Sequence, residues 1–195
     1  MATIGLRKPY IAKYEATGGV VDYTLGRLLA KAIEFTASIE SSEDNNLYAD
    51  DGIAESDRSF SNGTLTITTD DLEQEASAMI LGITPKSITV GEEEDVTELV
   101  YDDDMETPDL GFGVIIPKKV KGVNKFRAVV FHKVKFSIPE DSAVTQGETI
   151  EWQTPSLTGT IMRDDTEKRG WKSEATLSTS ELAETYIKEK LGMGV

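Results

Sequence analysis

Carboxylates are the most frequent chemically reactive side chains in this 195-residue sequence, which has 35 Asp and Glu residues against 20 Lys and Arg. Two clusters, Asp50-Asp51-Gly52 and Asp102-Asp103-Asp104, could bind calcium through hard oxygen ligands. Neither has the alternating ligand positions of an EF-hand loop, so we interpret both as solvated acidic surface. A carboxylate pair at the spacing of a glycoside hydrolase is expected by chance in so acidic a chain, and nothing singles out one pair.

The single histidine, His132, lies in a segment of alternating polarity, on the face that carries apolar residues. A histidine satisfied in the core or an interface is the commoner outcome there, and we identify no nucleophile near it. The chain has no cysteine, which excludes disulfides and thiolate metal sites. No nucleophile elbow, P-loop or dinucleotide-binding motif is present, and Gly111-Phe112-Gly113 is typical of a bulge or close backbone approach within a strand. We therefore predict no catalytic residue, no metal site and no cofactor, and a protein that is not an enzyme.

A basic region stands out against this acidic background. Its members are Lys118, Lys119, Lys121, Lys125 and Arg127. Three interpretations stay open: a phosphate-binding patch, a charged hairpin that turns at Gly122 and Asn124, and a surface that pairs with an acidic surface of another subunit. The acidic remainder of the chain disfavours phosphate binding, and we favour the contact between subunits.

The net charge of −15 is unevenly distributed along the chain. Residues 32–117 carry a net charge of −20, whereas residues 1–31 carry +3 and residues 118–163 carry +4. An acidic protein of this kind is a poor candidate for binding nucleic acid by neutralising phosphates. Opposite charge in two parts of one molecule instead favours head-to-tail contacts between copies.

The elements that must position these side chains are mainly strands. Alternation with a period of two predicts strands over 32–40, 64–68, 110–116, 126–136, 149–153 and 157–162. A turn is predicted at Asn62-Gly63 and a strand end at Pro117. In the strand 126–136 one face carries Phe126, Ala128, Val130, His132, Val134 and Phe136. Its other face is also partly apolar, so we expect this strand to lie at an interface.

Two segments predict helices. One covers 71–81, with an apolar stripe at helical spacing, Asp70 as N-cap and Gly82 as the stop. The other follows a capping-box pattern of Ser178 and Glu181, includes a favourable Glu184–Lys188 pair and ends at Gly192. We therefore predict a single mainly β domain over 1–195 with one internal helix, one C-terminal helix and a long acidic loop at 41–62. Neither a membrane span nor a signal peptide is recognisable, so we expect a soluble protein made in a cytoplasm.

The order of several segments is similar to that of a known family. These segments are Ile4-Gly5-Leu6-Arg7-Lys8-Pro9-Tyr10, the stretch 23–40, Leu47-Tyr48-Ala49-Asp50-Asp51, Gly63-Thr64-Leu65-Thr66-Ile67, the helix 70–82, Leu110-Gly111-Phe112-Gly113 and Trp152-Gln153-Thr154-Pro155. In order and spacing the chain resembles the major tail proteins (tail-tube proteins) of long-tailed siphophages, especially those of Gram-positive hosts. The resemblance covers nearly the whole chain.

This resemblance implies a β-sandwich or barrel-like domain that forms stacked, hexameric rings around a channel for DNA. The partners would be further copies of the chain, a tape-measure protein and tail-tip or terminator proteins, and no membrane. The location would be the virion tail, assembled in the bacterial host cytoplasm. By position, the ring-stacking role would fall to the loop 41–62, with Tyr48, Asp50, Asp51, Ile53 and Phe60 as its contact residues.

An acidic channel wall agrees with this expectation, because it repels the phosphates of passing DNA instead of binding them specifically. The runner-up is a β-sandwich module that binds carbohydrate or calcium, and a carboxylate-based hydrolase ranks last. Aromatic residues, which line many sugar-binding surfaces, make up only 7% of the chain.

Overall fold

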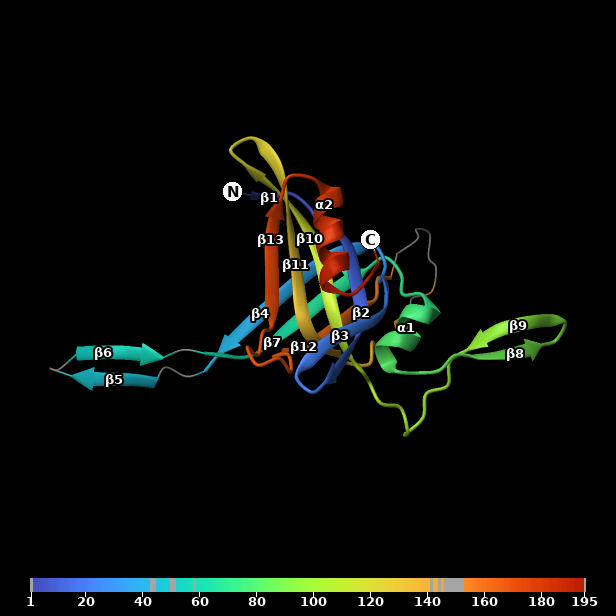
Figure 1. Cartoon of the computed structure of the whole chain (residues 1–195). Coiled ribbons are helices and arrows are strands. Elements are labelled where there is room, and N and C mark those ends of the chain that lie inside the picture. The colour runs from blue at the N-terminus through green and yellow to red at the C-terminus, as the bar shows by residue number, and fades with distance from the viewer. Residues whose placement is uncertain are drawn as a thin grey trace.

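The computed structural model describes residues 2–42, 45–49, 52–57, 59–140, 142–143, 145 and 153–194. Its elements, labelled in Figure 1, are β1 (Ala2–Thr3), β2 (Arg7–Thr17), β3 (Val20–Leu28), β4 (Ala32–Ser41), β5 (Asn45–Ala49), β6 (Gly52–Asp57), β7 (Phe60–Thr69), α1 (Gln74–Leu81), β8 (Lys86–Val90), β9 (Glu93–Glu98), β10 (Asp109–Val120), β11 (Val123–Phe136), β12 (Ser156–Met162), β13 (Lys172–Leu177) and α2 (Ser180–Lys190). The fold is mainly β with one internal and one C-terminal helix, as the periodicities predict. Residues 149–152 of the predicted strand 149–153 lie outside the described part of the chain.

One large antiparallel sheet forms the body, with the strand order β3-β2-β10-β11-β12-β7-β4. β1 pairs with β10, and β13 pairs with β11. Phe35 of β4 stacks on Phe112 of β10 with ring centroids 5.9 Å apart, so the two halves of the sheet fold over each other. The sheet is therefore a two-layered sandwich and does not close, because β3 and β4 end the strand order.

Two apolar clusters hold the layers together. The larger lies between the two halves of the sheet and includes Ile11, Leu65, Phe112 and Phe131. The smaller lies between the outer face of the sheet and α2, which contributes Ala183 and Ile187. The layers are thus sheet, sheet and helix, with strands β10 and β11 buried on both faces.

A bulge in β11 overturns the prediction that Phe126 to Phe136 share one face. Leu110 lies opposite Val134 and Phe112 opposite Phe131, so two residues of β11 stand where β10 has only Gly111. An extra residue reverses which face later side chains occupy. Val130 therefore faces α2, whereas Val134 belongs to the central core. At the same point β11 changes its second partner from β13 to β12.

The described residues of the segment 41–62 lie mainly in strands and not in a loop. β4 runs to Ser41, β5 pairs with β6, and β7 begins at Phe60. Asn62 and Gly63 lie within β7 instead of forming a turn. Gly63 is needed there for space, because a Cβ on it would lie 2.9 Å from the carbonyl oxygen of Ser38. Asp50 and Asp51 lie outside the described residues.

The ends of three other elements also differ from the predictions. The N-cap of α1 is Glu73, because the Asp70 carboxylate accepts instead from the Lys31 backbone N–H at 3.0 Å. The N-cap of α2 is Thr179, whose side chain accepts from Leu182 N, and not Ser178. β10 continues past Pro117 to Val120, because β1 and β11 both pair with this extension. The predicted stop at Gly82 is confirmed, since its φ of 71° is left-handed.

Candidate functional site

Three hairpins leave the body of the molecule, and they are its most prominent surface features. Figure 1 shows β5–β6 extending to one side, β8–β9 to the opposite side, and the turn between β10 and β11 above the body. A two-stranded hairpin that stands alone in water is only marginally stable. Hairpins of this kind are therefore candidate contacts for another molecule.

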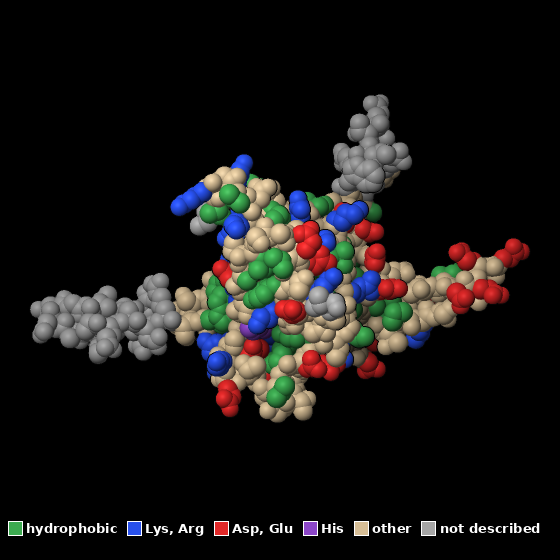
Figure 2. Space-filling view, turned by 45° about the horizontal axis from the view of Figure 1, so that its top comes forward, with side chains coloured by type: hydrophobic (Ala, Val, Ile, Leu, Met, Phe, Trp, Pro, Cys, Tyr) green, Lys and Arg blue, Asp and Glu red, His purple; other side chains and the backbone are tan. Residues whose placement is uncertain are grey.

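The β8–β9 hairpin, residues 86–98, is here called the acidic arm. It carries five carboxylates, Glu92, Glu93, Glu94, Asp95 and Glu98, against one basic residue, Lys86. Ile88 faces Val96 across the strands, the Ser87 hydroxyl donates to Asp95 at 3.1 Å, and Gly91 makes the turn with a φ of 64°. Figure 2 shows acidic side chains gathered at its end.

The turn of the β10–β11 hairpin, residues 118–125, is here called the basic tip. Lys118 lies opposite Lys125 and Lys119 opposite Asn124. Lys121 and Gly122 occupy the turn with φ values of 49° and 84°, the left-handed pair that a tight hairpin requires. Among the described residues none of its four lysines has an ion-pair partner.

The structure confirms a hairpin in the predicted basic region but separates Arg127 from the tip. Arg127 donates to Glu174 of β13, and so does Lys172 at 2.6 Å. Hydrogen bonds from Lys172 and Arg127 lower the pKa of Glu174 to about 2. Arg127 therefore holds β13 against β11, and its charge is balanced within the chain.

The predicted ring-stacking residues lie in two different places. Tyr48 and Ile53 are paired in the β5–β6 hairpin, outside the body. Phe60 belongs to the body, where its ring stacks on Trp171 at 4.6 Å between centroids and lies under Arg163. The ring of Phe60 is thus packed within the chain and not presented by the hairpin.

The prediction that the strand 126–136 is an interface strand is wrong. β11 pairs with β10 on one side and with β13 and then β12 on the other, so its backbone has no free edge. Its second apolar face is buried in the central core. Among the described strands of the main sheet, β3 and β4 end the strand order and each has one unpaired edge, as do β1 and β13, which each pair with a single strand.

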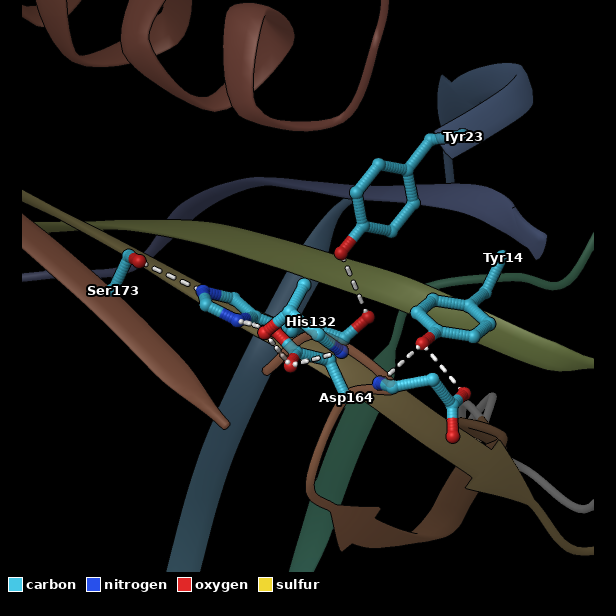
Figure 3. A network of polar contacts seen from close by, with 7 residues as sticks. Tyr14, Tyr23, His132, Asp164 and Ser173 are labelled. Carbon is cyan, nitrogen blue, oxygen red and sulfur yellow. Dashed lines mark hydrogen bonds and ion pairs between the residues drawn. The ribbon is translucent and has the colours of Figure 1, made fainter. Parts of the chain in front are cut away.

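A partly buried polar network surrounds His132 at the bulge, as Figure 3 shows. His132 Nδ1 lies 2.8 Å from Asp164 Oδ2, and Nε2 lies 2.7 Å from Ser173 Oγ. The other oxygen of Asp164 accepts from the backbone N–H and the hydroxyl of Thr166. Burial raises the pKa of the Asp164 carboxyl, but the hydrogen bonds from Thr166 and His132 outweigh it and the net shift is downward.

The order of these groups is that of a Ser–His–Asp triad, in which an acid orients the histidine and the histidine activates the serine. A nucleophile must also be reached by a substrate. Ser173 lies within β13, opposite Val130 in the sheet, and none of five surface pockets of the described part is lined by Ser173, His132 or Asp164. We therefore interpret the network as a clamp that joins β11, β13 and the 163–170 connection. Sequence reasoning missed it because its members are 32 and 41 residues from His132.

The clamp makes a testable contribution to stability. Replacing Ser173 by Ala removes one neutral hydrogen bond, so we expect the free energy of unfolding to fall by about 1 kcal/mol. Asp164→Ala should cost more, about 1–3 kcal/mol, because several partly buried donors then lose their acceptor. Urea denaturation measures both. Equal, negligible effects of the two substitutions would contradict the clamp.

A second polar cluster fixes α2 on the sheet. Glu184 accepts from Lys8, from Tyr10 Oη at 2.6 Å, and from Lys188 at 2.9 Å, so the predicted Glu184–Lys188 pair is confirmed. The hydrogen bond from Lys8, with those from Tyr10 and Lys188, lowers the pKa of Glu184 from 4.5 to about 2.

This shift predicts acid sensitivity. A carboxyl whose pKa is lower in the folded protein stabilises the fold above its unfolded pKa, and the stabilisation disappears as pH falls through the folded pKa. Glu184→Gln should therefore lower stability by about 1 kcal/mol at pH 7 and have little effect at pH 2. Thermal melts of both proteins between pH 2 and pH 7 measure this. A pH-independent difference would contradict the assignment.

No protein-family model matches the sequence, and no curated protein matches it. Within the described residues no group of three or more His, Cys, Asp and Glu side chains could hold a metal ion. In the same residues no helix is long and apolar enough to cross a membrane.

Proposed function

We propose that the chain is a structural subunit that joins copies of itself into stacked rings around a hollow tube, as in a phage tail. The observation that carries this proposal is the pair of hairpins, β5–β6 and β8–β9, that extend from opposite sides of the body. In the described part of the chain neither hairpin pairs with a further strand, and a marginally stable ribbon gains most from a contact with a neighbour.

The unpaired edges of β3 and β4 support the same proposal. A free strand edge is a template for pairing with another chain, and soluble monomers usually block it. Here both edges belong to one sheet, and each carries exposed apolar side chains. On β3 these are Val20, Leu25 and Leu28, and on β4 they are Ile33 and Ile39. Joining such edges around a ring would pair the free edges of β3 and β4.

The charge of the chain fits a channel for DNA. A net charge of −15 in each subunit gives an assembled wall that repels phosphate groups at close range. Contacts with a tape-measure protein and with tail-tip or terminator proteins belong to this proposal, as does a location in the virion tail. The role proposed for the chain is structural and not enzymatic.

Electron microscopy tests the proposal directly. We expect negatively stained preparations of the purified protein to contain rings or rods with a central channel. Size-exclusion chromatography with light scattering should report masses that rise with concentration. A protein that stays monomeric at millimolar concentration and binds a sugar or calcium would overturn the proposal in favour of a binding module.

A further inference from the structure

The acidic arm and the basic tip are two charged hairpins for which the described residues supply no ion-pair partner. The tip has four lysines, and no carboxylate occurs from residue 110 to residue 139. The arm has five carboxylates and one lysine. Both turns project into solvent, and each hairpin carries few or no charges of the opposite sign. The charges at the turns are therefore not neutralised within their own hairpin.

Each hairpin also presents one exposed valine beside its turn. Val90 precedes the turn of the arm and is 56% exposed, and Val123 follows the turn of the tip and is 57% exposed. An apolar contact enclosed by opposite charges is the usual composition of a specific protein interface. The two hairpins are therefore complementary in more than charge.

The two hairpins of one molecule do not meet. Figure 1 shows the tip above the body and the arm extending from its side, with the sandwich between them. A contact between unlike surfaces of two copies is heterologous, and repeating it gives a closed ring or an open stack.

Resting on the proposed function, we propose that the acidic arm of one subunit binds the basic tip of a neighbouring subunit in the tube. The partner of the tip is thus a second copy of this chain and not DNA. This contact offsets part of the repulsion between subunits of net charge −15. It also makes assembly sensitive to salt, because exposed charge pairs are screened at high ionic strength.

Cross-linking measures the proximity of the two hairpins. The natural chain has no cysteine, so an introduced cysteine has no competitor. Glu93→Cys and Lys121→Cys proteins, carrying tags of different size, are mixed, assembled and treated with a short bis-maleimide. We expect dimers that contain one copy of each variant. Glu93→Cys mixed with Lys190→Cys is the control, since Lys190 is exposed on α2. Tubes in which the test pair cross-links no more than the control overturn the proposal.

Charge reversal tests the energy of the contact. The tip-reversed variant changes Lys118, Lys119 and Lys121 to Glu, and the arm-reversed variant changes Glu92, Glu93 and Glu94 to Lys. We expect each variant alone to assemble at least about tenfold more slowly, and an equal mixture to recover, because each reversed hairpin then meets an opposite charge. The net-charge control for the arm-reversed variant changes three carboxylates elsewhere on the surface, Glu167, Glu181 and Glu189, to Lys.

The outcomes separate this contact from the function on which it rests. Normal tubes from both reversed variants overturn the contact and leave the tube proposal standing. Wild-type protein that never assembles overturns both. The contact is supported specifically if assembly recovers when the two reversed variants are mixed. Assembly should not recover when the tip-reversed variant is mixed with the net-charge control.

Discussion

Excising the β5–β6 hairpin should leave a stable folded monomer that does not form the tubes proposed for the full chain. The base of the hairpin offers a clean junction, because the Ser42 N–H donates to the Ser59 carbonyl at 2.8 Å and the Ser59 N–H donates to Ser42 Oγ at 3.1 Å. Residues 43–58 can therefore be replaced by Asn-Gly, which favours a tight turn between β4 and β7.

The body should tolerate this deletion. Leu65 and Ile67 of β7, which fill the core, lie beyond the junction, and Phe60 keeps its stacking on Trp171. Shortening a connection changes stability only slowly with its length, so we expect the free energy of unfolding to change by less than about 1 kcal/mol. Chemical denaturation and electron microscopy of the same preparation measure the two effects.

A second variant distinguishes the contribution of the apolar side chains to stacking from that of the hairpin as a whole. Tyr48→Ser/Ile53→Ser keeps the length of the segment and removes two of the three apolar residues that the tail-protein resemblance predicts as stacking contacts, while Phe60 is kept. We expect isolated rings or short rods from it. Full-length tubes from the deletion variant would refute the stacking role of the segment, while the tube proposal would still rest on the sheet edges.

Period-two alternation was sufficient to predict much of the β framework and the core residues of β7 and β10. It failed at the bulge beside His132, where an extra residue changes the face that later side chains occupy. The alternation pattern assumes that each residue of a strand lies opposite one residue of its partner strand. The hairpins β2–β3 and β8–β9 were also missed. The strands of the acidic arm are exposed almost throughout, and their apolar residues, Ile88 and Val90 in β8 and Val96 in β9, are too few to give the alternation that indicates a strand.

Surface features were predictable only in part. The basic tip could be found from sequence because its lysines are contiguous and its turn carries a glycine. The clamp could not, because the bulge, the 163–170 connection and β13 bring together residues that no local pattern links. The free edges of β3 and β4 follow from the order of strands in the sheet, which alternation along the chain does not encode.

Gly113→Val should be among the most destabilising substitutions in the chain. The sequence pattern Gly111-Phe112-Gly113 predicts a bulge or a close backbone approach, and the structure has both, since α2 packs directly on these glycines. A Cβ at Gly113 would lie 2.5 Å from Ile187 Cγ2. Because Ile187 is fully buried, its side chain has no room to move, and overpacking of this kind costs about 1–3 kcal/mol or more.

A double-mutant cycle distinguishes this clash from a general loss of strand flexibility. Ile187→Ala removes the clashing Cγ2 and by itself costs about 2–5 kcal/mol. If the clash dominates, Gly113→Ala should destabilise the natural chain but have a much smaller effect in the Ile187→Ala background. Gly194→Ala is the control, because a Cβ there meets nothing within 4 Å. Additive effects of Gly113→Ala and Ile187→Ala in urea denaturation would mean that α2 does not rest on the glycine strand as described.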